Sequence, residues 1–407
     1  MTSRFGWLDT DEAQRRRMME VVDLLRDEGT IDELGIGTIR DTIADALFPG
    51  LSVLHTRLRY VLFVPWLIDE AVARASGQQA PARLRRLETE LIESLRTGTS
   101  DLDESDGSGI IGISARGRLK RMPSAIYWAL LGRWGIRVWD EGVEGHLRRT
   151  AVLRQLRAGA PVADDPEAYE PVPVSGFLPS LPRAPEGLLT ATDFRLTVDE
   201  AEFVSVQIRA STIGSLLARL VDQRPTDNVS WVWELGDLAS APPAMVSLVD
   251  HARRLHTAIH GAPLLYNLLL AEESGRGALV DAYRGDLIEW SGELHREAVF
   301  EGWDRAAFWA TILTLNPRIH PRTRAFVDAW LDIAAATTDL AELPAARDLI
   351  TNRERQIKGA RSRLGNRAAL ERWSGASGLV RLTYRWHVAQ RLIADLHGMD
   401  GAGDARP

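Results

Sequence analysis

Nine apolar residues follow one another without interruption from Tyr60 to Ile68. A membrane-spanning helix needs about 20 such residues, and Arg59 and Asp69 close this run at its two ends. The run is therefore too short to cross a bilayer, and we interpret it as the central core element of an N-terminal unit. Pro65 removes the amide that would bond to the carbonyl of Val61, so we expect a helix to kink or restart there.

Two arginines, Arg57 and Arg59, stand directly before this apolar run. A buried guanidinium needs an acidic partner or backbone carbonyls, because an unpaired buried charge is strongly destabilising. We expect these arginines to pair with the acidic residues between Asp32 and Asp45. The alternative is that they belong to a basic surface formed by residues 116–137.

The chain has 407 residues and no cysteine. This composition excludes disulfides, iron–sulfur clusters, thiolate zinc sites and a cysteine nucleophile. The N-terminus has no apolar segment behind basic residues, so we expect no signal peptide. Together these features predict a cytoplasmic protein that does not enter the membrane.

The sequence is typical of a mainly α-helical protein with at most minor β structure. Alanine, leucine, arginine and glutamate dominate, and apolar residues often recur at spacings of three and four. The pattern predicts helices over 38–47, 82–98 and from Pro123 onward, with residues 248–273 forming one or two helices. Gly261 follows His260 and suggests a helix end at that point. Only the stretch DNVSWVWELGDL, residues 227–238, has some strand character.

Proline composition suggests where the chain divides. Seven of the 19 prolines lie between Gly159 and Leu189, and proline-rich stretches are typical of domain boundaries. We therefore predict an N-terminal helical unit over 1–158, a proline-rich linker or crossing over 159–189, a larger helical unit over 190–396 and a disordered tail over 397–407.

Positive charge is concentrated in two tracts, although the net charge of the chain is −7. Residues 113–137 contain six basic residues and no acid, and residues 353–391 contain ten basic residues and two acids. Arginines bind phosphate, and the aromatic residues between them could stack on bases. The candidate nucleic-acid-binding residues are Arg116, Arg118, Lys120, Arg121, Arg133, Arg137, Arg353, Arg355, Lys358, Arg361, Arg363, Arg367, Arg381 and Arg385.

Two alternatives explain the same pattern. The aromatic residues could be core residues with the arginines as their solvated rims, or the arginines could dock an acidic partner protein. Contacts to the DNA or RNA backbone would position the ligand without reading its sequence. The charge pattern thus predicts a binding or scaffold protein rather than a particular enzyme.

Only weak signs of catalytic chemistry are present. His256 and His260 are four residues apart and would share one helix face, which is half of a zinc site, but HTAIH lacks the glutamate of the H-E-x-x-H motif. We find no P-loop, dinucleotide fingerprint or Ser-His-Asp order. We expect no catalytic residue, no metal and no cofactor, with an unrecognised metal-dependent enzyme as the alternative.

Several segments together resemble one bacterial and actinobacterial family known only as a domain of unknown function. They are FGWLD from Phe5, TRLRYVLFVPWL from Thr56, KRMPSAIYWALLGRWGI from Lys120, IHGAPLLYNLLLAE from Ile259 and LTYRWHVA from Leu382. The resemblance implies a complete family member and assigns no catalytic residue. The resemblance also implies gene neighbours of helicase and phospholipase-D-like type in defence-type loci, and hence a nucleic-acid or complex-forming role. The leading expectation is therefore a non-enzymatic accessory subunit of a DNA-processing or antiphage-defence complex.

Overall fold

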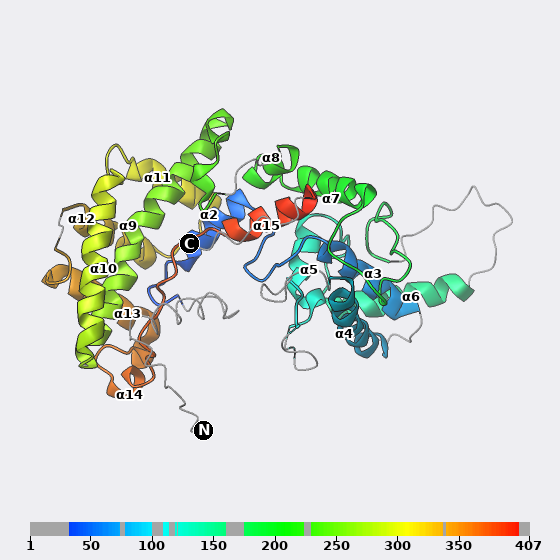
Figure 1. The fold of residues 1–407 in the computed structure, drawn as a ribbon, viewed down its shortest axis with the longest axis horizontal. Helices are drawn as coiled ribbons and strands as arrows, with labels where there is room; N and C mark the ends of the chain where they lie inside the picture. The colour runs from blue at the N-terminus through cyan, green and yellow to red at the C-terminus, as the bar shows by residue number, and fades with distance from the viewer. Residues whose placement is uncertain are drawn as a thin grey trace, which may run out of the picture. The chain divides into compact units, whose positions relative to one another are not determined.

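The computed structural model describes residues 32–73, 78–99, 109–113, 119, 121–159, 175–223, 229–336 and 339–398. Within these ranges the chain forms fourteen α-helices and three short 3-10 helices and no β-strand (Figure 1), which confirms the predicted fold class. Extended pairing among the described residues is limited to an isolated bridge between Arg137 and Phe177.

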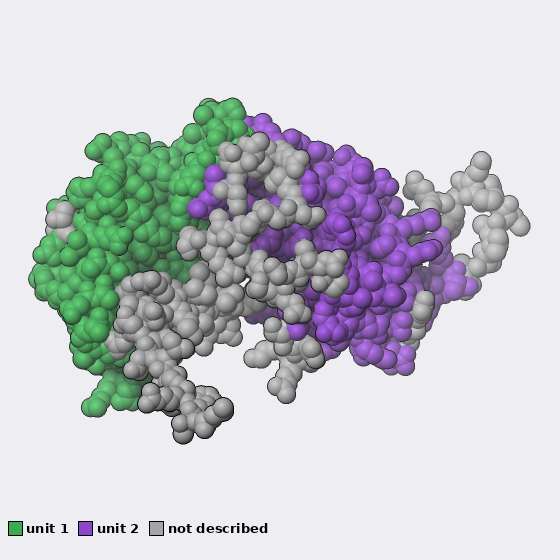
Figure 2. Space-filling model, viewed as in Figure 1, with its two compact units in different colours: residues 1–46, 231–384 green, residues 47–230, 385–407 purple. Residues whose placement is uncertain are grey.

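The chain divides into two compact units, coloured separately in Figure 2. Unit 1 comprises residues 1–46 and 231–384, and unit 2 comprises residues 47–230 and 385–407. These boundaries differ from the predicted ones. The described part of the proline-rich stretch, residues 175–189, lies inside unit 2 and is followed there by residues 190–230, which were predicted to begin the C-terminal unit. Each unit is thus built from two separate stretches of chain.

Unit 1 is organised around the 31-residue helix α9, Pro243–Glu273. Four helices pack on it, namely α10 (Gly277–Arg296), α11 (Arg305–Leu315), α12 (Pro321–Ala336) and α13 (Pro344–Lys358). Shorter elements complete the unit: α2 (Gly37–Leu47, whose last residue falls in unit 2), η4 (Val232–Glu234), η5 (Leu238–Ser240), η6 (Gly359–Arg361) and α14 (Arg367–Leu370).

The predicted helix end at Gly261 is wrong, because α9 continues through this residue. Gly261 has a packing role. A Cβ atom at this position would lie 2.4 Å from the ring of Trp290 on α10. The glycine therefore lets α9 and α10 approach closely, and the indole of Trp290 fills the space where a side chain would stand. The expected strand character near residue 231 is also wrong, since a 3-10 helix forms at Val232–Glu234.

Unit 2 is organised around α3, Tyr60–Ala73. It packs against α4 (Ala80–Gly98), α5 (Pro123–Arg133) and α6 (Val143–Gly159). The remaining helices of the unit are α7 (Val198–Ser211), α8 (Leu216–Asp222) and α15 (Trp386–Leu396). The C-terminal helix α15 packs on α8, and His397 just after it hydrogen-bonds to the carbonyl of Leu220 at 3.2 Å. Residues 399–407 of the predicted tail lie outside the described residues.

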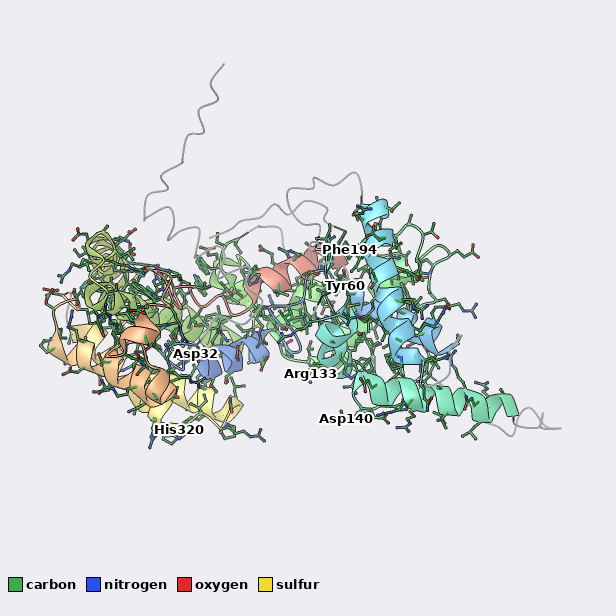
Figure 3. All side chains as sticks on the ribbon, turned by 90° about the horizontal axis from the view of Figure 1, so that it is seen from below. Asp32, Tyr60, Arg133, Asp140, Phe194 and His320 are labelled. Carbon is green, nitrogen blue, oxygen red and sulfur yellow. The ribbon has the colours of Figure 1, made fainter. Side chains whose placement is uncertain are left out.

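The prediction for the apolar run is confirmed, because every residue from Tyr60 to Ile68 is buried. The helix passes through Pro65 as one element and does not restart there. Aromatic residues of α3 form a cluster with Phe194, which lies outside this helix. The ring centroids of Tyr60 and Phe194, labelled in Figure 3, are 5.5 Å apart. In the described part of the chain, no helix combines the length and apolar character needed to span a bilayer.

Candidate nucleic-acid interface

The first basic tract is only partly described. Arg116, Arg118 and Lys120 lie outside the described residues. Arg121, just before α5, and Arg133, its last residue, are exposed, and Arg133 Nη1 donates to the carbonyl of Ser211 at 3.3 Å.

Arg137 of the same tract faces inward. Its guanidinium lies 5.0 Å from the ring centroid of Trp128, and it donates to the carbonyls of Trp139 and Glu141. Two of the aromatic neighbours, Tyr127 and Trp134, have 0% and 1% exposure, whereas Trp128, which Arg137 covers, is half-buried. Tyr127 and Trp134 are the deeply buried pair. These aromatic side chains are core residues and are not accessible for stacking on bases.

Arg353 of the second tract is a structural residue. It is 5% exposed, although it was predicted as a phosphate contact. Its Nε donates to the carbonyl of Leu34 at 2.8 Å, and its Nη2 donates to the carbonyl of Gly35 at 3.2 Å and to Thr323 Oγ1 at 2.9 Å. Arg353 therefore attaches residues 34–35 to α13, because its donors are directed at these groups.

A buried charge cluster uses two further members of the second tract. It consists of Glu33, Tyr266, Glu354, Lys358 and Arg363, all within unit 1. Arg363 Nη1 donates to Glu33 Oε1 at 2.7 Å, and Lys358 Nζ contacts both Glu33 Oε2 and Glu354 Oε1. The phenol of Tyr266 donates to Glu354 Oε1 at 2.6 Å and accepts from Lys358 Nζ at 2.9 Å and Arg363 Nη1 at 3.2 Å.

The electrostatics of this cluster favour stable pairing over acid–base chemistry. Burial alone would raise the pKa of Glu354, but hydrogen bonds from the amides of Arg363 and Leu364, from Tyr266 and from Lys358 outweigh it and lower that pKa. Burial and the nearby carboxylates raise the pKa of Tyr266, so its phenol stays protonated at neutral pH. Two carboxylates and two cations leave the cluster with no net charge.

Arg381 and Arg385 are also engaged in internal contacts. Arg381 forms a bidentate pair with Glu293, with Nη1–Oε1 at 2.7 Å and Nη2–Oε2 at 2.6 Å. Arg385 precedes α15 in a left-handed backbone conformation and donates from Nη1 to the carbonyl of Leu51 at 2.8 Å. Both guanidinium groups are therefore already bound within the protein, and neither is an unpaired cation of the predicted interface.

Arg355, Arg361 and Arg367 differ from these residues because all three are exposed. They stand on the consecutive elements α13, η6 and α14. Arg367 lies near Glu371 at 3.4 Å, yet its side chain remains 93% exposed. Such an exposed pair contributes little stability and leaves the guanidinium accessible to a ligand.

His256 and His260, the two candidate zinc ligands, do not have the surroundings that zinc-binding histidines have. His256 Nδ1 lies 3.0 Å from the carbonyl of Leu382, and its Nε2 lies 3.4 Å from Arg381 Nη1. Because a guanidinium only donates, Nε2 accepts and Nδ1 carries the proton. Burial lowers the pKa of His256 to about 4 and that of His260 well below its ordinary value. Among the described residues, no group of three or more potential ligands is placed to hold a metal ion.

An aromatic cluster around His256 was not predicted from the sequence. The indoles of Trp231 and Trp233 stack with their ring centroids 5.3 Å apart. Each indole meets the imidazole of His256 in a T-shaped arrangement, with ring centroids 4.4 and 4.8 Å apart. The W-x-W spacing is a local signal for this pair. Nothing local indicates His256, which lies more than twenty residues further along the chain.

The expected partners of Arg57 and Arg59 are wrong. Arg57 Nε donates to Asp395 Oδ1 at 2.9 Å. Arg59 binds Glu200 in a bidentate pair at 3.0 and 2.8 Å. Asp32, in the range predicted to supply partners, instead caps the start of α2 by accepting from the amides of residues 36 and 37.

Comparison with known proteins places the chain without assigning it an activity. No curated protein and no solved structure matches it. A family model matches residues 2–400, nearly the whole chain. The protein belongs to the family of unknown function DUF6361.

Proposed function

We propose that this protein is a non-enzymatic accessory subunit of a bacterial DNA-processing or antiphage-defence complex, and that it contacts the nucleic-acid backbone through Arg355, Arg361 and Arg367. The observation that carries this proposal is their exposure on three consecutive elements of unit 1. Among the other predicted contacts of this tract, Lys358 and Arg363 pair with buried acids, Arg381 pairs with Glu293, and Arg353 and Arg385 donate to backbone carbonyls, whereas these three side chains are exposed.

The buried contacts support this proposal by fixing the backbone that carries the exposed arginines. Arg353 attaches α13 to residues 34–35, and Glu354 accepts from the amides of residues 363 and 364 just after η6. An arginine on an ordered backbone loses less conformational entropy when it binds than one on a mobile loop. Arg121 and Arg133 of unit 2 are further exposed candidates.

Binding of this kind depends on salt and is weakly specific. Each phosphate that a cation neutralises contributes about −0.9 to the slope of log K against log salt concentration. Three arginine contacts therefore predict a slope of about −3. Duplex and single-stranded DNA or RNA should bind with similar strength, because backbone contacts carry no sequence information.

Gel-shift titrations at low salt test the proposal with the full-length protein. The triple variant Arg355→Ala/Arg361→Ala/Arg367→Ala should bind on the order of tenfold or more weakly and show a shallower salt slope. A control with the same charge change is Arg86→Ala/Arg183→Ala/Arg296→Ala, at three exposed arginines outside both tracts. The proposal fails if the folded wild-type protein binds neither duplex nor single strand, or if the control loses as much affinity as the test variant.

A second candidate function is a scaffold whose basic surface docks an acidic partner protein. Ile357 supports it, because this apolar side chain is 38% exposed between Arg355 and Arg361. An apolar residue among arginines suits a protein interface better than a phosphate backbone. In this version a helicase or phospholipase-D-like protein would be the partner. Co-purification with that partner, unchanged by nuclease treatment, is the expected result.

A further inference from the structure

Three peptide bonds join the two units, because each unit contains two separate stretches of chain. These bonds, which we call the crossings, follow Ala46, Ser230 and Tyr384. All three lie at the ends of helical elements: the first joins the last two residues of α2, the second comes just before η4, and the third comes just before α15. Movement between two parts of a protein is concentrated at such ends, where a few residues absorb the change in φ and ψ.

Within unit 2, the residues next to all three crossings are held together at the start of α15. Arg385, the first residue after the third crossing, donates from Nη1 to the carbonyl of Leu51 at 2.8 Å. The ring of Trp386 lies 6.0 Å from that of Phe48, just after the first crossing. Trp386 Nε1 also donates to the carbonyl of Val229, just before the second crossing, at 3.1 Å. Trp386 therefore connects the first two crossings to the third.

Within unit 1, one turn of α9 holds the residues next to the second and third crossings. Trp231, the first residue after the second crossing, meets His256 with ring centroids 4.4 Å apart. His256 Nδ1 lies 3.0 Å from the carbonyl of Leu382, and the phenol of Tyr384 donates to the carbonyl of Ala252 at 2.8 Å. These two crossings therefore leave unit 1 from the same turn of the same helix.

The backbone of the third crossing is strained. Tyr384 and Arg385 have φ values of 52° and 66°, in the left-handed region that residues other than glycine rarely adopt. Two such residues in succession persist only where the surrounding structure holds them. Here the phenol of Tyr384 is bound in unit 1 and the guanidinium of Arg385 in unit 2. The direction of the chain is thus fixed from both sides within two residues.

We propose that the three crossings form a single hinge and that Arg385 and Trp386 restrain its movement. Connections gathered at one place allow one unit to turn as a whole, whereas connections far apart would prevent such rotation. Movement at the hinge changes the φ and ψ angles of the crossing residues and leaves the helices of both units intact. This proposal is independent of the nucleic-acid contact proposed above, because it uses none of the residues that would make it.

The absence of cysteine from the chain allows the movement to be measured with site-specific spin labels in the full-length protein. One label is placed in each unit, at Ile288→Cys on α10 and at Ile213→Cys after α7, because these side chains are 73% and 84% exposed. Double electron–electron resonance then gives the distribution of distances between the units. A second pair, Val152→Cys with Ile213→Cys, lies entirely in unit 2 and shows whether that unit keeps its fold.

Trp386→Phe keeps an aromatic ring beside Phe48 but loses the donor to the carbonyl of Val229. We expect the fraction of molecules outside the main distance between the units to rise about fivefold, which is the effect of one lost hydrogen bond on an equilibrium. The pair of labels inside unit 2 should show no change. Trp66→Phe is the matched control, because it loses an indole donor to the carbonyl of Pro182 elsewhere in unit 2, and it should alter neither distribution.

Three results would overturn the proposal. An unchanged distribution between the units in Trp386→Phe would show that this residue does not restrain them. A broader distribution inside unit 2 would show that Trp386 serves only the packing of that unit, and equal broadening in Trp66→Phe would show that the crossings are not special. Tyr384→Phe is a second test, because it removes the anchor in unit 1 and keeps every side chain of unit 2. It should also broaden the distribution between the units, and an unchanged distribution would contradict the hinge.

Discussion

Unit 1 and unit 2 differ in where their most deeply buried arginine stands in the sequence. In unit 1, Arg353 and Arg363 belong to a dense basic tract and are nevertheless directed inward, where Arg363 pairs with Glu33. In unit 2, Arg121 and Arg133 of the other tract are exposed, while the buried cation Arg59 lies outside both tracts and pairs with Glu200. Local charge density therefore does not determine which arginines reach solvent.

The position of the buried partner, either an acid or a backbone carbonyl, determines it instead. Glu33 and Arg363 are 330 residues apart in the sequence, and Arg57 and Asp395 are 338 apart. Each pair forms only because the fold brings two distant stretches of the same unit together. A run of basic residues is consequently a weak predictor of a binding surface until its buried acids are known.

The largest expected effect comes from breaking a buried pair in each unit. Glu354→Gln in unit 1 should lower the free energy of unfolding by about 3–5 kcal/mol, because it leaves Lys358 and Arg363 without full compensation. Glu200→Gln in unit 2 should cost a similar amount through Arg59. Denaturant titration followed by tryptophan fluorescence measures both. Asp348→Asn, at an exposed acid of α13, is the control and should change stability by less than about 0.5 kcal/mol. Losses below about 1 kcal/mol in both variants would contradict a stabilising role for these pairs.

Acid should destabilise both units through their buried histidines. Burial lowers the pKa of His256 in unit 1 and of His146 in unit 2 to about 4, whereas an unfolded histidine binds its proton near 6.5. The unfolded state therefore binds more protons between pH 6.5 and 4, and stability falls as the pH falls through that window. Each histidine contributes up to about 3 kcal/mol to this loss.

A comparison of the wild-type protein with His256→Gln isolates the contribution of His256 to the pH dependence of the free energy of unfolding. Burial raises the pKa of Asp69 to about 6, and this group changes stability in the opposite direction over the same range. We expect His256→Gln to flatten the pH dependence of the free energy of unfolding between pH 6.5 and 4. The exposed His320→Gln should leave the slope as it is. An unchanged slope in His256→Gln would show that the pKa of His256 is the same in the folded and the unfolded protein.

Two glycine substitutions compare close packing with open space inside unit 1. Gly261→Ala should cost about 1–3 kcal/mol, because its new methyl group would meet the ring of Trp290 at 2.4 Å. Gly285→Ala on α10 meets nothing within 4 Å and should be neutral or stabilise the helix by up to about 1 kcal/mol. Thermal unfolding of the two variants gives the sign directly. Equal effects would mean that α9 and α10 can separate without cost.

The smallest effect is expected at the exposed arginines. Arg355→Ala in unit 1 and Arg121→Ala in unit 2 should each change the free energy of unfolding by less than about 0.5 kcal/mol. Arg353→Ala, two residues from Arg355, should cost several times more, because it leaves the carbonyls of Leu34 and Gly35 without their donor. Denaturant titration separates the two classes. A large loss in Arg355→Ala would assign this residue to the core as well.

Local sequence signals predicted individual elements well. Apolar periodicity with proline and glycine punctuation indicated helices that the structure places at Gly37–Leu47, Ala80–Gly98 and Pro123–Arg133. The apolar run from Tyr60 to Ile68 was recognised as core because it is too short for a membrane-spanning helix.

Features that depend on distant contacts were not predictable in this way. Gly261 reads as a helix end until Trp290 is known to lie against it. Within the candidate site, the exposed Arg355 and the buried Arg353 are indistinguishable by composition, and only the carbonyls of residues 34 and 35 separate them. Sequence reasoning therefore supplied the candidates for the interface, and the long-range contacts selected among them.

The division of each unit into two stretches of chain affects how the protein is made on the ribosome. Glu33 leaves the ribosome 330 residues before its partner Arg363, which at 5–20 residues per second is roughly 15–65 s. During that interval the charged side chain has no native partner, and residues 47–230 emerge in between. Unit 2 in turn waits for α15 near the end of the chain. Neither unit can finish folding until translation is almost complete, so nascent chains stalled before residue 363 should leave both units open to proteolysis.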